Sequence, residues 1–267
     1  MLHIGLIGSG AIAMGVLELT RQDPSLQVSW VIASERSLAA ARDKLTQLQL
    51  DAQVLCSLPA DAKPDLLVEC AGHSAIEQHV IPALERGISC LVVSVGALSS
   101  AGLAEQLEAA ARRGNSHVEL LPGAIGAIDA LAAARVGGLE TVIYSGRKPA
   151  QAWKGTPAEQ VCNLDTLQEA KVIFEGSARE AARLFPKNAN VAATLSLAGL
   201  GLDRTQVRLI ADPHSEQNIH QVEASGAFGS FELTMRGKPL PSNPKTSALT
   251  VFSVVRALGN HAGAVAI

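Results

Sequence analysis

The chain has 267 residues, of which 48% are hydrophobic and 18% charged, and its formal net charge at pH 7 is -3. This length suffices for one large domain or two modest ones, and the apolar content supports a sizeable core rather than disorder. A slightly negative charge without a long basic run argues against nucleic acid as a main partner. Aromatic residues make up only 3% of the chain, which disfavours stacking platforms for bases.

The N-terminal residues and the cysteine spacing bear on the cellular location of the protein. The first residues form no basic leader, and no apolar stretch is long enough to span a bilayer, so we expect a cytoplasmic protein without a membrane partner. The four cysteines form no CxxC pair, and no metal-ligand spacing is recognisable, so we expect free thiols and no metal. Cys70 and Cys90 lie in apolar runs, which is typical of small buried residues.

The most informative motif stands at the start, where residues 2–15 read LHIGLIGSGAIAMG. An apolar run, Gly8-x-Gly10-x-x-Ala13 and an alanine-rich pattern predict a strand, a tight turn and a helix. Gly8 permits the turn, Gly10 lets a pyrophosphate approach the backbone, and Ala13 packs helix against strand. The first helical turn, with Ala11 and Ile12, offers N–H groups and partial positive charge. The motif therefore predicts a dinucleotide site.

The residues after the second expected strand, 28–33, bear on the choice of cofactor. An acidic residue there binds the ribose 2′-hydroxyl of NAD, whereas a basic one accommodates the 2′-phosphate of NADP. Glu35 fits NAD, while Ser34 and Arg36 fit NADP, and Ser34 has the alternative role of capping the next helix. We therefore expect NAD or NADP as the cofactor.

Strands and helices continue to alternate through the first half of the chain. We expect helices over 37–48, 73–87 and 99–113, and strands over 54–55, 64–72, 88–95 and 117–121. This order predicts a Rossmann-type doubly wound parallel sheet, with ligands beyond the carboxyl ends of its strands. The loop containing Ala71 and Gly72 and the glycine-rich segment 121–126 should lie at that edge.

The pattern changes after Gly137-Gly138. We expect strands over 141–146, 171–176, 206–211, 219–224 and 230–235, and helices over 177–184 and 188–198, with irregular structure over 147–149 and 153–157. Turn signals at Asp212-Pro213 and Ser225-Gly226 favour a second, α+β domain built on a mainly antiparallel sheet. We assign residues 1–125 to dinucleotide binding and 126–244 to substrate binding, catalysis and oligomerisation. A C-terminal helix at about 245–267 can return to the first domain.

Six segments share a pattern with one enzyme family: Gly8-x-Gly10-x-x-Ala13, LPGAIG at 121–126, LFPKNANVAAT at 184–194, ADP at 211–213, NIH at 218–220 and NPKTS at 243–247. Together they resemble the L-aspartate dehydrogenases over essentially the whole chain. The resemblance implies NAD(P)-dependent oxidation of L-aspartate to iminoaspartate, which hydrolyses to oxaloacetate and ammonia or supplies NAD biosynthesis. It also implies that His220 is catalytic, that Ala124 and Asn190 contact the cofactor, and that the chain forms homodimers or larger assemblies.

The residues themselves leave part of this open. His220 shares a strand face with Val222 and Ala224, where a histidine is more often a core residue, yet an imidazole also exchanges protons near neutral pH. His73 and His214, in loops, are weaker rivals. Asn190 has the alternative role of a helix cap. A substrate with two carboxylates needs cationic or hydroxyl donors. The candidates are Lys187, Thr194, Lys245, Thr246 and Ser247.

Two other functions fit the same sequence. One is a different two-domain NAD(P)-dependent reductase acting on aspartate-derived or sugar substrates. The other is a protein that binds NAD(P)H without turnover, for which loss of His220 would have no effect on function. A substrate screen separates the first from an aspartate enzyme, and the absence of any substrate-dependent change in absorbance identifies the second.

Overall fold

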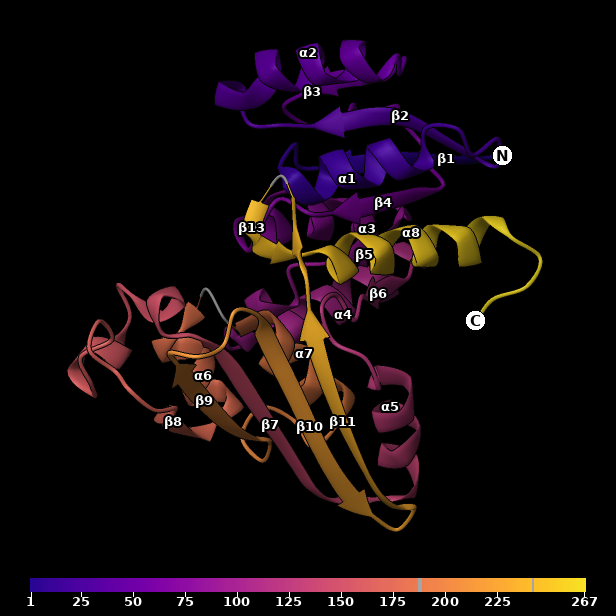
Figure 1. Cartoon of the computed structure of the whole chain (residues 1–267). Helices are drawn as coiled ribbons and strands as arrows, with labels where there is room; N and C mark the ends of the chain where they lie inside the picture. Colours follow the sequence, from indigo (N-terminus) through magenta and orange to yellow (C-terminus); the bar gives the residue numbers. More distant parts are fainter. Residues whose placement is uncertain (187–188, 242) are drawn as a thin grey trace. The chain divides into compact units, whose positions relative to one another are not determined.

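The structure is a computed structural model that describes residues 1–186, 189–241 and 243–267. It divides into two compact units (Figure 1). The first comprises Met1–Gly123 together with Leu240–Ile267, and the second comprises Ala124–Pro239. No helix in the described ranges is both long and apolar enough to cross a membrane.

The first unit is built on a six-stranded parallel sheet with the order β3-β2-β1-β4-β5-β6. Strands β1 to β3 are added toward one edge of the sheet and β4 to β6 toward the other. The strand order therefore reverses between the neighbours β1 and β4, which is the switch point where doubly wound folds bind dinucleotides. This confirms the predicted Rossmann-type sheet. Its strands are β1 (Leu2–Ile7), β2 (Leu26–Ile32), β3 (Gln53–Leu55), β4 (Leu66–Glu69), β5 (Ser89–Val92) and β6 (Val118–Leu120).

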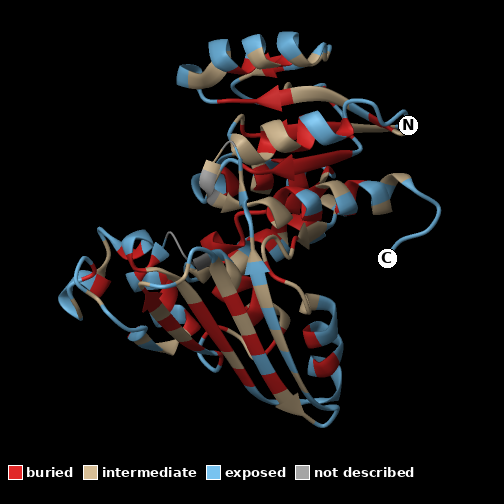
Figure 2. Ribbon diagram, in the orientation of Figure 1, coloured by how far each residue is buried: buried red, intermediate tan, exposed pale blue. Residues whose placement is uncertain are grey.

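The central strands of this sheet are buried along most of their length, as Figure 2 shows in red. Ile4, Leu6, Val68 and Leu91 have no exposed surface, which is typical of parallel strands covered by helices. The main helices of the unit are α1 (Ala11–Thr20), α2 (Leu38–Leu48), α3 (Ile81–Glu85), α4 (Leu103–Gly114) and α8 (Ala248–Ala262), with short turns η1 (Glu35–Ser37), η2 (Ile76–Val80) and η3 (Val95–Ser99).

The C-terminal helix α8 belongs to the core of the first unit. Val251, Val254 and Leu258 are buried in the same apolar cluster as Ala13 and Val16 of α1. Removing these side chains from water is a main source of stability for the unit. The return of the chain after residue 239 is therefore driven by apolar burial against α1.

One predicted helix of the first unit is interrupted. Where we expected a continuous helix over 73–87, the structure has the π-helical turn η2 followed by the short α3. Pro82, near the start of α3, has no N–H to donate to a carbonyl four residues earlier, and its ring displaces that carbonyl. The widened turn accommodates this gap in the hydrogen-bond ladder.

The second unit contains a five-stranded mixed sheet with the order β11-β10-β7-β9-β8. Of its four pairings, only β7 with β9 is parallel, so the predicted mainly antiparallel sheet is confirmed. The strands are β7 (Leu139–Pro149), β8 (Lys171–Ser177), β9 (Gln206–Asp212), β10 (Asn218–Gly226) and β11 (Gly229–Gly237). The other elements of this unit are α5 (Ile128–Gly137), α6 (Ala178–Leu184), α7 (Ala189–Ala198), η4 (Ala150–Trp153) and η5 (Pro157–Gln160). Two short paired strands follow where the chain returns to the first unit: β12 (Pro239–Leu240) and β13 (Asn243–Ser247), of which β13 belongs to the first unit.

Three details of the second unit differ from expectation. β9 and β10 are not neighbours joined across Asp212-Pro213, because β7 lies between them. Residues 147–149 are not irregular but extend β7, where they pair with the end of β9. Helix α5 was not predicted, since it buries only Leu131 and Ala134 and so gives little apolar periodicity.

One face of this sheet carries the core of the second unit. Tyr144, Leu209 and Val222 are buried on it, while Arg208 and Glu223 lie on the opposite face. Alternation of burial along β10 is visible as bands in Figure 2. Helices α5, α6 and α7 pack against this sheet, so its apolar positions are removed from water.

Candidate functional site

The turn between β1 and α1 is built from glycines with different roles. Gly8 has a φ of +113°, and a Cβ there would lie 2.9 Å from Cα of Ala71 and from the carbonyl oxygen of Cys70. A Cβ on Gly10 would meet no atom within 4 Å. Ala13, one turn into α1, is fully buried. The turn is therefore pressed against the end of β4 at Gly8 and open in front of Gly10.

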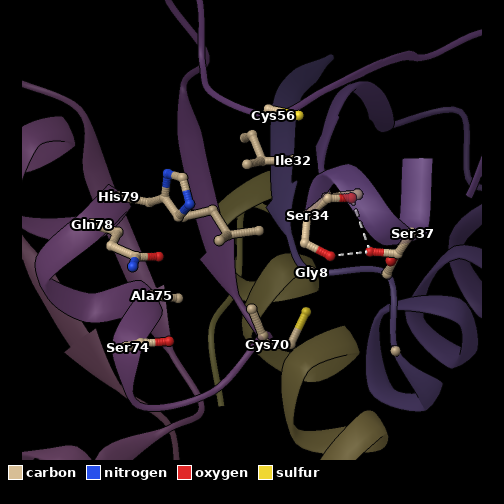
Figure 3. A pocket seen from close by; sticks show the side chains of 15 residues that line it. Gly8, Ile32, Ser34, Ser37, Cys56, Cys70, Ser74, Ala75, Gln78 and His79 are labelled. Atoms are coloured by element: carbon tan, nitrogen blue, oxygen red, sulfur yellow. Dashed lines mark hydrogen bonds between the residues drawn. The ribbon is translucent and has the colours of Figure 1, made fainter.

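A cavity of about 730 Å³ lies beside this turn (Figure 3). Its walls come from the ends of β1 and β2 with the turns that follow them, from the loops after β3 and β4, and from η2. Cavities of this size hold cofactor-sized ligands. Among the described residues that line it there is no Asp, Glu, Lys or Arg. A phosphate here would be bound by backbone N–H groups and hydroxyls rather than by a cationic side chain.

Of the three residues expected to determine the preference for NAD or NADP, only one lines the cavity. Ser34 lines the cavity together with Ser37, and their hydroxyl oxygens are 2.6 Å apart (Figure 3). Glu35 and Arg36 are exposed, and neither is among the lining residues. Ser37 was not among our candidates, although its place at the end of the same turn could have indicated it.

Glu69, at the end of β4, is fully buried and was missed in the sequence. One of its carboxylate oxygens accepts hydrogen bonds from the N–H groups of Ala71 (2.8 Å) and Gly72 (2.9 Å) and from the hydroxyl of Ser94 (2.9 Å). The other accepts from the N–H of Ser94 at 2.9 Å. These four bonds tie the loop after β4 to the loop after β5. The sequence signal that could have indicated this role is a single carboxylate at the end of an apolar run, because a buried charge needs hydrogen-bond partners.

In the second unit, His220 on β10 is only 6% exposed and faces into the sheet's core. Its Nδ1 lies 2.8 Å from the hydroxyl oxygen of Tyr144 on β7, and the two rings are stacked with an interplanar angle of 18°. Gly146 is directly opposite His220 in the β7–β10 register. The imidazole is therefore held by a buried partner from the neighbouring strand.

Lys148 supplies positive charge to the same neighbourhood. Burial, assisted by the charge of Lys148, lowers the pKa of His220 to about 4. Burial also lowers the pKa of Lys148 to about 8, and its Nζ lies 5.3 Å from the centre of the Trp153 ring. Near pH 7 this arrangement combines a neutral imidazole, which can accept a proton, with a cation, which attracts carboxylates.

The strand alternation could have identified Lys148. Tyr144, Gly146 and Lys148 occupy alternate positions of β7, so they share one face. We read residues 147–149 as irregular and therefore did not extend that face to Lys148. Burial raises the pKa of the Tyr144 hydroxyl, so this group is a neutral phenol near pH 7.

The other candidate residues are distributed over both units. In α7, Asn190 is exposed, and its carbonyl accepts a hydrogen bond of 2.8 Å from the buried hydroxyl of Thr194. Ala124 is half-buried in the turn that opens the second unit. Thr246 is half-buried in β13 of the first unit. Lys187 lies outside the described residues, as does the side chain of Lys245.

The remaining candidates have other surroundings. Ala11 and Ile12 are half-buried at the start of α1, and Ser247 precedes α8 without a side-chain cap bond. His73 is exposed. The backbone N–H of His214 donates to Oδ1 of Asp212 at 2.8 Å, and its ring Nε2 lies 2.8 Å from the carbonyl oxygen of Gln168.

Asp212 itself is part of an ion pair with Arg147, with a separation of 2.9 Å. Burial works against its ionisation, but donation from Arg147 and from the His214 N–H holds its pKa below the ordinary range. Within the described residues, no cluster of three or more His, Cys, Asp and Glu side chains could hold a metal ion.

Comparisons with known proteins agree along the whole chain. The sequence profile described as "Aspartate dehydrogenase, C-terminal" matches residues 129–261, and that described as "Homoserine dehydrogenase, NAD binding domain" matches residues 8–121. The L-aspartate dehydrogenases of Pseudomonas aeruginosa and Cupriavidus necator are 71% and 68% identical over 100% of both chains. The crystal structure of aspartate dehydrogenase from Thermotoga maritima is similar with a TM-score of 0.78 and 25% identity, covering 100% of this chain and 99% of that one.

Gly8→Ala should lower stability, whereas Gly10→Ala should lower cofactor affinity with little effect on stability. At Gly8 the positive φ and the clash with backbone atoms should lower the free energy of unfolding by about 1–3 kcal/mol. At Gly10 a Cβ fits the fold but points into open space, so stability should change by less than about 0.5 kcal/mol. NADH affinity of Gly10→Ala, measured by fluorescence titration, should fall at least about ten-fold. Unchanged affinity would contradict a cofactor site at this turn.

Glu69→Gln should destabilise the first unit although the side chains have nearly equal size. The amide Nε2 would confront an N–H donor instead of accepting from it, which costs about 2 kcal/mol for a buried group. Urea unfolding measures the loss, and the exposed Glu105→Gln serves as control. Equal stability of the two variants would contradict the anchoring role of the carboxylate.

Protonation of His220 should weaken the fold in acid. Because its pKa falls from 6.5 to about 4 on folding, only the unfolded chain binds a proton at this residue between those pH values. The free energy of unfolding should therefore decrease as the pH drops through this window, by up to about 3 kcal/mol from this group. Denaturant titrations of wild type, His220→Gln and the exposed His117→Gln test this. Equal slopes in all three would contradict it.

Proposed function

The chain belongs to the L-aspartate dehydrogenase family and is an NAD(P)-dependent oxidoreductase, and we propose that it oxidises L-aspartate at Cα to iminoaspartate. Hydrolysis of the imine gives oxaloacetate and ammonia. The observation that carries this proposal is the buried, neutral His220 beside the cationic Lys148. A proton acceptor next to a cation suits the oxidation of an amino acid with two carboxylates.

The residues of the first unit fit NAD or NADP. The open space before Gly10 and the start of α1, with Ala11, Ile12 and Ala13, would receive the pyrophosphate at a helix N-terminus. Ser34 and Ser37 would bind the ribose hydroxyls or the 2′-phosphate. Further contacts are proposed for Gly8, Glu35, Arg36, Ala71, Gly72, Ala124 and Asn190. When bound, the cofactor accepts a hydride from the substrate.

His220 is proposed to accept a proton during this oxidation. The substrate must lose a proton from its ammonium group before its Cα can become part of an imine, and the later attack of water releases another. A neutral imidazole can accept the first proton, pass it to solvent and then accept the second, and its low pKa favours this return to the unprotonated form at neutral pH. The reverse direction, from oxaloacetate and ammonia, would use the protonated ring as the donor.

The substrate carboxylates require positive or hydrogen-bonding groups. Lys148 is proposed as one of them because it is cationic and lies close enough to His220 to influence its charge. Thr194, Thr246, Lys187 and Lys245 remain candidates for the other contacts.

We further propose that the protein works as a cytoplasmic homodimer, that its second unit carries the oligomerisation surface, and that its iminoaspartate supplies NAD biosynthesis.

Initial rates of NADH or NADPH formation with L-aspartate test this function. Wild type should turn over with at least one cofactor, and His220→Asn should lower kcat by about 10²–10⁴-fold because the proton acceptor is lost. NADH affinity should stay within about two-fold of wild type, since the cofactor cavity is in the other unit.

The exposed His117→Asn serves as the matched control and should retain full activity. Absence of turnover with aspartate, and with oxaloacetate plus ammonia, would remove the aspartate assignment and leave a dinucleotide-binding protein. Full turnover by His220→Asn would support the aspartate dehydrogenase activity but show that His220 has only a structural role in the core.

A further inference from the structure

Gly146 leaves a gap beside His220 that the ring of Tyr144 fills. A Cβ on Gly146 would lie 2.7 Å from the Tyr144 hydroxyl oxygen, 3.1 Å from its Cζ and 3.3 Å from Cδ2 of Leu209. Separations under 3.0 Å are not tolerated by real Cβ atoms, so the phenol would have to move. Any side chain larger than hydrogen at position 146 would therefore displace the Tyr144 hydroxyl.

The contact that occupies this gap is well defined. Tyr144 is 2% exposed and His220 6%, and their side chains form a 2.8 Å hydrogen bond through Nδ1 of the imidazole. Buried polar groups need such partners, because water is not present to replace them. With Nδ1 engaged, Nε2 is the ring nitrogen left to exchange a proton with another molecule.

We infer that Tyr144 is a positioning residue for His220, and that Gly146 is required because it leaves room for the Tyr144 hydroxyl. This inference rests on the proposed role of His220. The phenol does not itself transfer protons to substrate; its oxygen accepts a hydrogen bond from Nδ1–H, which fixes the orientation of the imidazole and the tautomer in which Nε2 carries no hydrogen and can accept a proton. On the sheet face that carries His220, its neighbour on β11 is the uncharged Met235, and the charged group on β7 that acts on it is Lys148.

A double-mutant cycle tests the pairing. Tyr144→Phe should lower kcat about ten-fold, the effect of about one lost hydrogen bond, while KM for aspartate and NADH affinity change less than about two-fold. Gly146→Ala should lower kcat similarly, because its Cβ displaces the hydroxyl. In the double variant the second substitution should add less than about two-fold, since phenylalanine has no hydroxyl to displace.

Gly137→Ala is the matched control, because a Cβ at that position meets no atom within 4 Å. It should retain wild-type kcat and thermal stability. Wild-type kcat in Tyr144→Phe would overturn the inference, and so would multiplicative losses from the two substitutions. If Gly146→Ala does not fold, Tyr144→Phe alone decides, because it preserves the ring and removes only the hydroxyl.

Nitrogen NMR of the His220 ring provides a readout that does not depend on turnover. The His220→Asn spectrum identifies the signals by their absence. Wild type should show only the tautomer with the hydrogen on Nδ1, and Tyr144→Phe a mixture of the two. A wild-type ring with the hydrogen on Nε2 would overturn the inference. A mixture in wild type would overturn the inference even if aspartate is oxidised. Absence of aspartate turnover with a single tautomer in wild type would instead refute the proposed function and leave the Tyr144–His220 pairing intact.

Discussion

Burying an ionisable side chain is tolerated only where hydrogen bonds replace the water that it loses, and each unit is organised around one such group. In the first unit the Glu69 carboxylate accepts four hydrogen bonds and joins the loops that follow β4 and β5. In the second unit His220 is paired with Tyr144 across neighbouring strands. Both groups lie inside regular sheets, so the geometry around them is set by strand register rather than by mobile surface loops.

The two units supply different kinds of chemistry. The lining of the first cavity offers backbone N–H groups and hydroxyls, which suit phosphates and sugar hydroxyls without placing a fixed cation beside them. The second unit offers titratable side chains whose charge states are set by burial: a neutral imidazole, a neutral phenol and a lysine with a lowered pKa. In the proposed function, binding the dinucleotide and moving the proton therefore depend on separate sets of residues.

The first sheet could be predicted because strand, glycine turn and helix alternate with a clear apolar pattern from Leu2 onward. The second sheet was less accessible, since nothing local in the sequence indicates that β7 lies between β9 and β10. Helix α5 was missed because its small buried face hardly differs from its exposed one. Lys148 was missed because residues 147–149 were read as irregular, so the face that it shares with Tyr144 and Gly146 was not extended to it. Glu69 was missed because the loops after β4 and β5, which supply its hydrogen bonds, meet around it only in the folded chain.

The most direct test of this account follows the hydrogen on Cα of the substrate. L-aspartate carrying deuterium at Cα should be incubated with the protein and NAD or NADP, and the reduced cofactor analysed by mass spectrometry. If hydride leaves Cα, the deuterium should be transferred to the nicotinamide of the reduced cofactor while oxaloacetate and ammonia accumulate. Reduced cofactor without deuterium, or no reduction with either cofactor, would contradict oxidation of aspartate by hydride transfer.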